Sequence, residues 1–129
     1  MENKDLKKII KDSVRVLLDD DKENIQAILL FGSQVNNKAI WRSDIDLCVV
    51  FKKELNIKKA TLFRKRMLGL LPTKVDLQVF NNLPLKIKKS IADNHKVIFR
   101  STDFDEFGFV KRNRVLSMEL KRRIAAVGI

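Results

Sequence analysis

Two aspartates separated by one residue, Asp44 and Asp46, have the types and spacing that most clearly suggest chemistry in this chain. They lead into the apolar run 47–50, which is typical of a buried strand. Side chains at i and i+2 of a strand project from the same side, about 6.5 to 7 Å apart. Two like charges there are costly unless a cation or solvent compensates them, and Mg²⁺ accepts carboxylate oxygens together with substrate phosphates. The alternative is a solvated strand end, because Asp-x-Asp is a common pattern.

Two further elements belong with this pair. Gly32 and Ser33 follow an apolar run, and a glycine at a strand exit permits a tight turn while the next residue offers a hydroxyl and an N–H to an anion. They are candidates for phosphate binding, although an ordinary turn uses the same residues. Asp76 lies in the alternating run 75–80, opposite the apolar face. A third carboxylate on a neighbouring strand could complete a site for two Mg²⁺ ions about 3.5 to 4 Å apart, suited to in-line phosphoryl displacement.

Hydrophobic periodicity predicts the elements that must position these residues. We expect helices over 3–19 and 56–70 and from Pro84 through Ile91, and strands over 25–31, 44–51, 75–80 and 96–100. Strands that alternate with helices predict one α/β or α+β domain, a mixed sheet of about four strands with helices packed on one face.

The last part of the chain, 101–129, is predicted to contain a long helix that follows capping residues. Its apolar stripe consists of Phe109, Leu116, Leu120, Ile124 and Val127. Two interpretations remain open. The helix could dock on its own domain, or the stripe with Phe104 and Phe107 could form a homodimer or partner interface.

The charge balance is strongly basic. The 129 residues include 27 Lys and Arg against 16 Asp and Glu, a net charge of +11, which attracts phosphate-rich or acidic partners without deciding between nucleic acid, nucleotide and acidic protein. The single cysteine, Cys48, excludes an internal disulfide framework. The sequence also contains no secretory segment and no apolar run of membrane-spanning length. Together with the single cysteine, these observations predict a cytoplasmic protein with no membrane partner. The only histidine, His95, is predicted to be a loop residue without a catalytic role.

The combination of Gly32-Ser33, the spacing to the run 43–47, and the run 75–77 resembles the signature of the nucleotidyltransferases of the DNA polymerase beta superfamily. More narrowly, the chain resembles the minimal nucleotidyltransferases, which are antitoxin-type partners of HEPN-domain proteins. The resemblance covers about residues 1–100, the expected nucleotidyltransferase domain, and leaves 101–129 as a helical extension of the same domain. It implies a polymerase-beta-like palm core.

The resemblance also implies roles for the site residues. Asp44 and Asp46 would bind two Mg²⁺ ions, Asp76 would bind the catalytic ion and help to activate the attacking hydroxyl, and Gly32 and Ser33 would hold the triphosphate. The implied reaction is transfer of a nucleotide, AMP from ATP, to a hydroxyl acceptor such as a tyrosine on a HEPN toxin. After Gly-Ser the family usually has a small residue, a basic residue and a second glycine, and this chain instead has the segment 34–37, Gln-Val-Asn-Asn. The candidates for the missing phosphate contacts are Lys38, Arg42 and Ser43.

Two alternative functions stay open. The altered turn is compatible with an antitoxin that neutralises its partner by binding alone. The net charge of +11 is compatible with a nucleotidyltransferase that binds nucleic acid, although the sequence contains no recognisable base-reading module.

Overall fold

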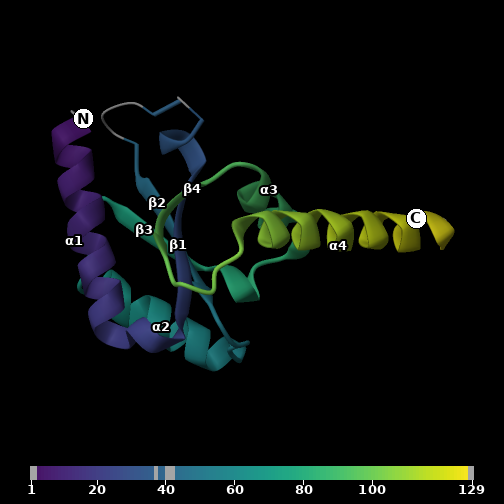
Figure 1. Cartoon of the computed structure of the whole chain (residues 1–129), viewed down its shortest axis with the longest axis horizontal. Helices are drawn as coiled ribbons and strands as arrows, with labels where there is room; N and C mark the ends of the chain where they lie inside the picture. The colour runs from purple at the N-terminus through teal and green to yellow at the C-terminus, as the bar shows by residue number, and fades with distance from the viewer. Residues whose placement is uncertain (1–2, 37, 40–42, 128–129) are drawn as a thin grey trace.

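The structure is a computed structural model that describes residues 3–36, 38–39 and 43–127. It contains α1 (Asn3–Asp21), β1 (Ile25–Phe31), β2 (Ile45–Phe51), α2 (Ile57–Leu68), β3 (Val75–Val79), α3 (Leu85–Asp93), β4 (Lys96–Arg100) and α4 (Glu106–Ala126) (Figure 1). Each predicted helix and strand is confirmed, and the bounds of β1 and β4 agree with the prediction residue for residue. Helix α2 is shorter than predicted at both ends, and its start is fixed by Asn56, whose side chain accepts a hydrogen bond of 2.8 Å from the Lys59 N–H.

The strands form one mixed sheet in the order β3-β2-β1-β4. Strand β1 pairs antiparallel with both β2 and β4, and β2 pairs parallel with β3. The predicted mixed sheet of four strands is therefore confirmed. Strand β3 lies at one edge of this sheet, so it has a neighbouring strand on one side only.

Helices cover both faces of the sheet, so the expectation that they would pack on one face is incomplete. Helices α1 and α2 cover one face, where Leu17, Phe63 and Met67 join the core with the inward residues of β1, β2 and β3. Helix α3 and the beginning of α4 cover the other face (Figure 1). The physical reason lies in the two central strands, which are buried at most positions on both faces, so each apolar face must be shielded from water.

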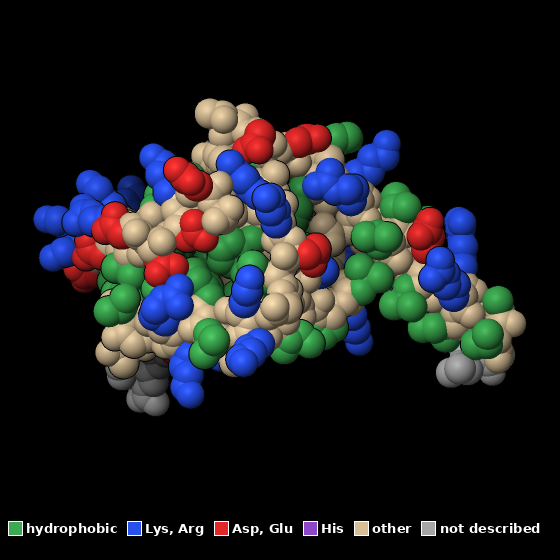
Figure 2. Space-filling model, turned by 90° about the horizontal axis from the view of Figure 1, so that it is seen from below, with side chains coloured by type: hydrophobic (Ala, Val, Ile, Leu, Met, Phe, Trp, Pro, Cys, Tyr) green, Lys and Arg blue, Asp and Glu red, His purple; other side chains and the backbone are tan. Residues whose placement is uncertain are grey.

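The two interpretations of the C-terminal helix apply to different parts of it. Phe104 and Phe109 are buried in the second core cluster, so they stabilise the domain itself and are not available to a partner. Phe107 is 79% exposed. The distal half of α4 extends away from the sheet as an arm that carries hydrophobic side chains among Lys and Arg (Figures 1 and 2). Its partly exposed apolar residues are Val115, Leu116, Met118, Leu120 and Ile124.

His95 lies in the loop between α3 and β4, as predicted, but its side chain is only 5% exposed. One ring nitrogen contacts the Ile91 carbonyl at 2.9 Å and the other contacts the Glu106 carboxylate at 2.8 Å. The imidazole therefore links the end of α3 to the start of α4. Within the described ranges, no helix combines the length and apolar character that crossing a bilayer requires.

Candidate active site

Asp46 of β2 and Asp76 of β3 lie directly beside each other. The parallel register pairs Asp46 with Asp76, so the two carboxylates occupy neighbouring positions on adjacent strands. Because side chains alternate along a strand, the flanking residues Leu47 and Leu77 lie in the core on one face and both aspartates lie on the opposite face. The sequence predicted this orientation for Asp76, and only the strand order brings it next to Asp46.

Asp44 lies one residue before β2 and is exposed. Its charge nevertheless reaches Asp46, whose carboxyl has a pKa raised above its usual value by burial, then by the negative charge of Asp76, then by that of Asp44. Three carboxylates thus form one electrostatic group around Asp46. A site with this much negative charge favours a cation, because a nearby positive charge removes the repulsion between the carboxylates.

Gly32 provides the turn that faces these carboxylates. It has φ of 77°, a backbone conformation that residues with a side chain rarely adopt, and a Cβ at this position would overlap Oδ2 of Asp46. The turn closes on itself: the Gly32 carbonyl accepts hydrogen bonds from the N–H groups of Val35 and Asn36 at 3.1 and 3.2 Å, and the Ser33 carbonyl accepts one from Lys38 at 3.2 Å. The backbone of the turn therefore lies close to the Asp46 carboxylate.

Residues that depart from the family pattern connect this turn to its surroundings. The Gln34 side chain donates to the Asp44 carbonyl at 3.5 Å, and the side-chain amide of Asn94 donates to that of Asn36. The first contact joins the turn to the segment before β2, and the second joins it to the loop after α3. The sequence shows that this turn departs from the family pattern. It does not show these two links, which join residues 10 and 58 positions apart.

Arg64 of α2 contacts the site from the edge of the sheet. Its Nε donates to the carbonyl of Leu77 at 2.6 Å, and a terminal nitrogen donates to Oδ1 of Asp76 at 3.1 Å. A run of basic residues on a helix, such as 64–66, is usually just surface charge, and for Arg64 that interpretation is incomplete because its guanidinium group also bonds to β3. The neighbouring Arg66 does fit it, since it pairs with Asp20 on the surface, 2.9 Å apart.

The other predicted phosphate contacts are Lys38, Arg42 and Ser43. Lys38 is exposed, and Ser43 is half-buried at the approach to β2. Arg42 lies outside the described residues, so the structure does not test it. The described part of the predicted site therefore comprises the Gly32-Ser33 turn, Lys38, Ser43 and the carboxylates of Asp44, Asp46 and Asp76.

The donor chemistry of these residues fits Mg²⁺. Across the part of the chain that the structure describes, no group of three or more His, Cys, Asp or Glu side chains is arranged to hold a metal ion by itself. Mg²⁺ does not require such a cage, because it usually keeps several waters and takes one or two carboxylates plus substrate phosphates. The paired oxygen donors Asp46 and Asp76, beside a turn suited to phosphate, meet this requirement.

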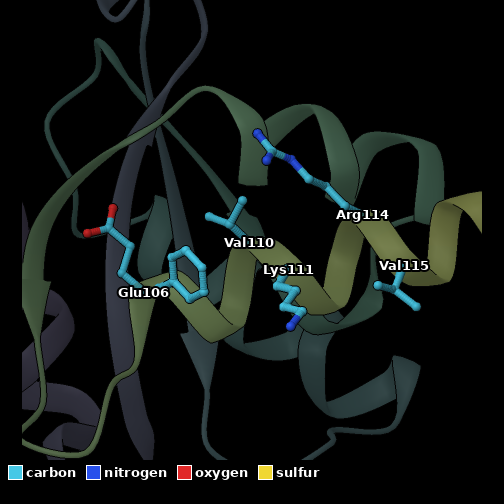
Figure 3. Close-up of a pocket in the computed structure, with 6 residues that line it drawn as sticks. Glu106, Val110, Lys111, Arg114 and Val115 are labelled. Carbon is cyan, nitrogen blue, oxygen red and sulfur yellow. The ribbon is translucent and has the colours of Figure 1, made fainter.

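Several hollows in the described surface lie away from the carboxylates. One cavity of about 580 Å³ runs along one flank of α4, where Glu106, Val110, Lys111, Arg114 and Val115 line it (Figure 3). All its lining residues belong to the first half of a single helix, so it is an open side of α4. We therefore base the functional argument on the geometry of the carboxylates and the turn.

Comparison with known proteins shows the family of the chain. The family described as polymerase beta, nucleotidyltransferase matches residues 5–104, and the chain belongs to this family. A provisionally assigned protein adenylyltransferase of Methanocaldococcus jannaschii is 44% identical over 72 residues, which are 56% of this chain and 53% of that protein. The chain thus matches about half the length of this curated relative.

Solved structures share the fold. A chain from a crystal structure of a toxin-antitoxin with AMP-PNP superposes with a TM-score of 0.69 and 21% identity, over 89% of this chain and 92% of that one. A chain from the complex of a tri-AMPylated Shewanella oneidensis HEPN toxin with its MNT antitoxin superposes with a TM-score of 0.67 and 19% identity, over 93% of each chain. The expected membership of the polymerase beta nucleotidyltransferase family is confirmed, and these structures confirm the fold that the resemblance implied.

Proposed function

We propose that this chain is a Mg²⁺-dependent nucleotidyltransferase that transfers AMP from ATP to a hydroxyl group of a partner protein. The observation that carries the proposal is the pairing of Asp46 with Asp76 beside the Gly32-Ser33 turn. Family membership supports the reaction type. Like charges at adjacent strand positions are costly for folding, and a site that binds a cation and a triphosphate gives this arrangement a use.

Each residue has a distinct part in the proposed reaction. Asp44 and Asp46 would hold Mg²⁺, and Ser33 with the backbone of the turn would bind phosphate oxygens of the nucleotide. Asp76 would also bind metal, and it would accept the proton of the acceptor hydroxyl. The oxygen of that hydroxyl forms a bond to the α-phosphorus while the bond from the α-phosphorus to pyrophosphate breaks. When bound, Mg²⁺ neutralises the negative charge that develops on the phosphate oxygens.

The choice of AMP and of a protein acceptor rests on the relatives. The name of the M. jannaschii relative indicates adenylyl transfer to protein, and one structure of the same fold contains AMP-PNP while another accompanies a tri-AMPylated HEPN toxin. We infer that the acceptor is a HEPN-family toxin and that AMP transfer makes this chain an antitoxin. A buried, unpaired Cys48 is in keeping with action in the cytoplasm.

Calorimetric titration with ATP, GTP, CTP and UTP, with and without Mg²⁺, tests this proposal. We expect Mg²⁺-dependent binding of ATP that is lost in Asp44→Asn and Asp46→Asn. Asp19→Asn is the matched control, since it removes the same charge from an exposed position at the end of α1. Binding that is equal in all three variants would disprove the assigned site. If ATP binds as expected, a HEPN partner is next tested for a gain in mass of one AMP per modified residue.

A second function is an antitoxin that acts by binding alone. Two features favour it: the turn after Ser33 lacks the family's basic residue, and an oxygen of Asp76 is already engaged by Arg64. Equal neutralisation of a HEPN toxin by the wild type and Asp44→Asn, without AMP on the toxin, would establish this function in place of transfer.

A further inference from the structure

Arg64 bridges two groups on the same strand. Its Nε donates to the Leu77 carbonyl and its terminal nitrogen to the Asp76 carboxylate, at 2.6 and 3.1 Å. Leu77 belongs to β3, the edge strand, so Arg64 reaches this strand from helix α2 without interrupting a pair of strands. The residue thus connects the helix layer on one face to a carboxylate on the other.

The backbone contact makes Arg64 a fixed donor. A guanidinium group carries its N–H donors in a planar fork, and a bond from one nitrogen restricts where the others point. Because the Leu77 carbonyl belongs to the sheet, its hydrogen bond holds the guanidinium group of Arg64 at a fixed position relative to β3. The terminal nitrogen is then held at Asp76 with less loss of side-chain freedom than an unanchored arginine would require.

Asp76 needs such a support. Its side chain is 40% exposed, and it lies beside the negative charge of Asp46. Repulsion from Asp46 and contact with water both favour rotation of the Asp76 carboxylate away from its strand neighbour. The hydrogen bond from Arg64 engages Oδ1 and leaves Oδ2 available to a metal ion.

We propose that Arg64 is a positioning residue for Asp76: through its joint contact with the Leu77 carbonyl and Oδ1, it holds Asp76 in the orientation that binds the catalytic metal ion. This inference rests on the proposed function, in which Asp76 is a metal ligand. In this role Arg64 acts through Asp76, the side chain to which it donates. Groups that orient metal ligands in this way typically change metal affinity or activity by about 10- to 100-fold when they are removed.

The test uses Mn²⁺ as the probe, counted by electron paramagnetic resonance and calorimetry on the full chain in the presence of saturating AMP-PNP. The variants are Arg64→Gln, Arg64→Lys, Asp76→Asn and the control Arg66→Gln. Arg66 lies on the same helix and loses an ion pair of similar exposure, with Asp20 instead of Asp76. Thermal unfolding of each variant separates a loss of folding from a loss of metal.

We expect one Mn²⁺ site to disappear in Asp76→Asn, and to weaken by about tenfold or more in Arg64→Gln. Arg64→Lys should recover only part of this affinity, because an ammonium group cannot reproduce the planar fork. The affinity of the chain for AMP-PNP, which the proposed function assigns to Asp44 and Asp46, should change less than the affinity of the Asp76-dependent site for Mn²⁺. Arg66→Gln should bind Mn²⁺ as the wild type does.

The outcomes distinguish this inference from the function on which it rests. An Mn²⁺ site that depends on Asp76 but is unchanged in Arg64→Gln would overturn the role of Arg64 alone. A site that becomes tighter in Arg64→Gln would overturn it too, because Arg64 would then compete with the metal for Asp76. Wild type without any Mn²⁺ site that depends on Asp76 would overturn the proposed function together with this inference.

Discussion

Gly32 lies so close to the carboxylate of Asp46 that no side chain fits between them. A Cβ at position 32 would overlap Oδ2 of Asp46, and the backbone there has φ of 77°. Gly69, by contrast, has φ of −70° at the end of α2, and the atom nearest to its Cβ would be the Arg66 carbonyl oxygen at 3.5 Å, an ordinary contact. One glycine is thus required by the site, and the other is not.

Gly32→Ala should damage the site, whereas Gly69→Ala should not. The left-handed conformation costs alanine about 1–2 kcal/mol, and the overlap with Asp46 must displace either the turn or the carboxylate. Since a misplacement of about 1 Å can cost about 100-fold in activity, we expect Gly32→Ala to weaken Mg²⁺-dependent ATP binding strongly as well as to lower the melting temperature. Calorimetry with Mg²⁺ and ATP, together with thermal unfolding, measures both effects. Equal affinity in the two variants would contradict the placement of the turn at the nucleotide.

Asp46→Asn should stabilise the fold at neutral pH while it abolishes nucleotide binding. Burial and the charges of Asp76 and Asp44 raise the pKa of Asp46 in the folded chain, so the folded state binds its proton more tightly than the unfolded state does. Stability from this group is therefore lost as the pH rises from the ordinary aspartate pKa through the raised one. Asparagine carries no charge and avoids that loss.

Thermal unfolding from pH 3 to pH 8 checks this prediction. We expect Asp46→Asn to raise the melting temperature by a few degrees above pH 6, and we expect the difference to shrink as the wild type is protonated at lower pH. Asp44→Asn should have a smaller effect, because Asp44 is exposed. A lower melting temperature for Asp46→Asn at every pH would show that its carboxylate stabilises the fold.

His95→Ala should weaken the fold without affecting the site directly. The buried imidazole joins the Ile91 carbonyl to the Glu106 carboxylate, so its loss removes both of these hydrogen bonds and leaves the Ile91 carbonyl with the Asn94 N–H, 3.2 Å away. We expect a decrease of about 1–3 kcal/mol in the free energy of unfolding, measured in urea. Mg²⁺-dependent ATP binding at temperatures well below unfolding should be unchanged. A complete loss of binding in a folded variant would assign His95 a role at the site.

Leu120→Glu should impair association through α4 and leave the domain folded. Leu120 is 44% exposed on the distal half of the helix, where it packs less against the domain than Phe109 does. If this face joins two copies of the chain, light scattering should give a dimer for the wild type and a monomer for the variant. If it instead binds a HEPN partner, both chains should be monomeric and only the wild type should bind that partner. Unchanged behaviour of the variant in both assays would exclude this face as an interface.

Most of the fold could be predicted from the sequence because its signals are local. Apolar runs at a period of two or 3.6 residues depend on neighbours in the chain, so β1 and β4 were located to the residue. The sequence does carry a signal for the covered second face, because the continuous apolar runs of β1 and β2 are typical of strands buried on both faces, and the expectation of helices on one face did not use it. The loop position of His95 agrees with the prediction, but its contact with Glu106, 11 positions away, depends on how α4 packs against α3.

The sequence by itself determined which groups the candidate site contains: the Gly32-Ser33 turn, Asp44 just before β2, and two aspartates, Asp46 and Asp76, that alternation directs away from the core. The tertiary structure alone decided how those groups meet. Strand order made β2 and β3 neighbours and their register paired Asp46 with Asp76, and the packing of α2 brought Arg64 to Asp76, 12 positions away. The physical reason is that residue type and periodicity are properties of a continuous segment. Register, edge position and contact between elements result instead from burying all the segments together.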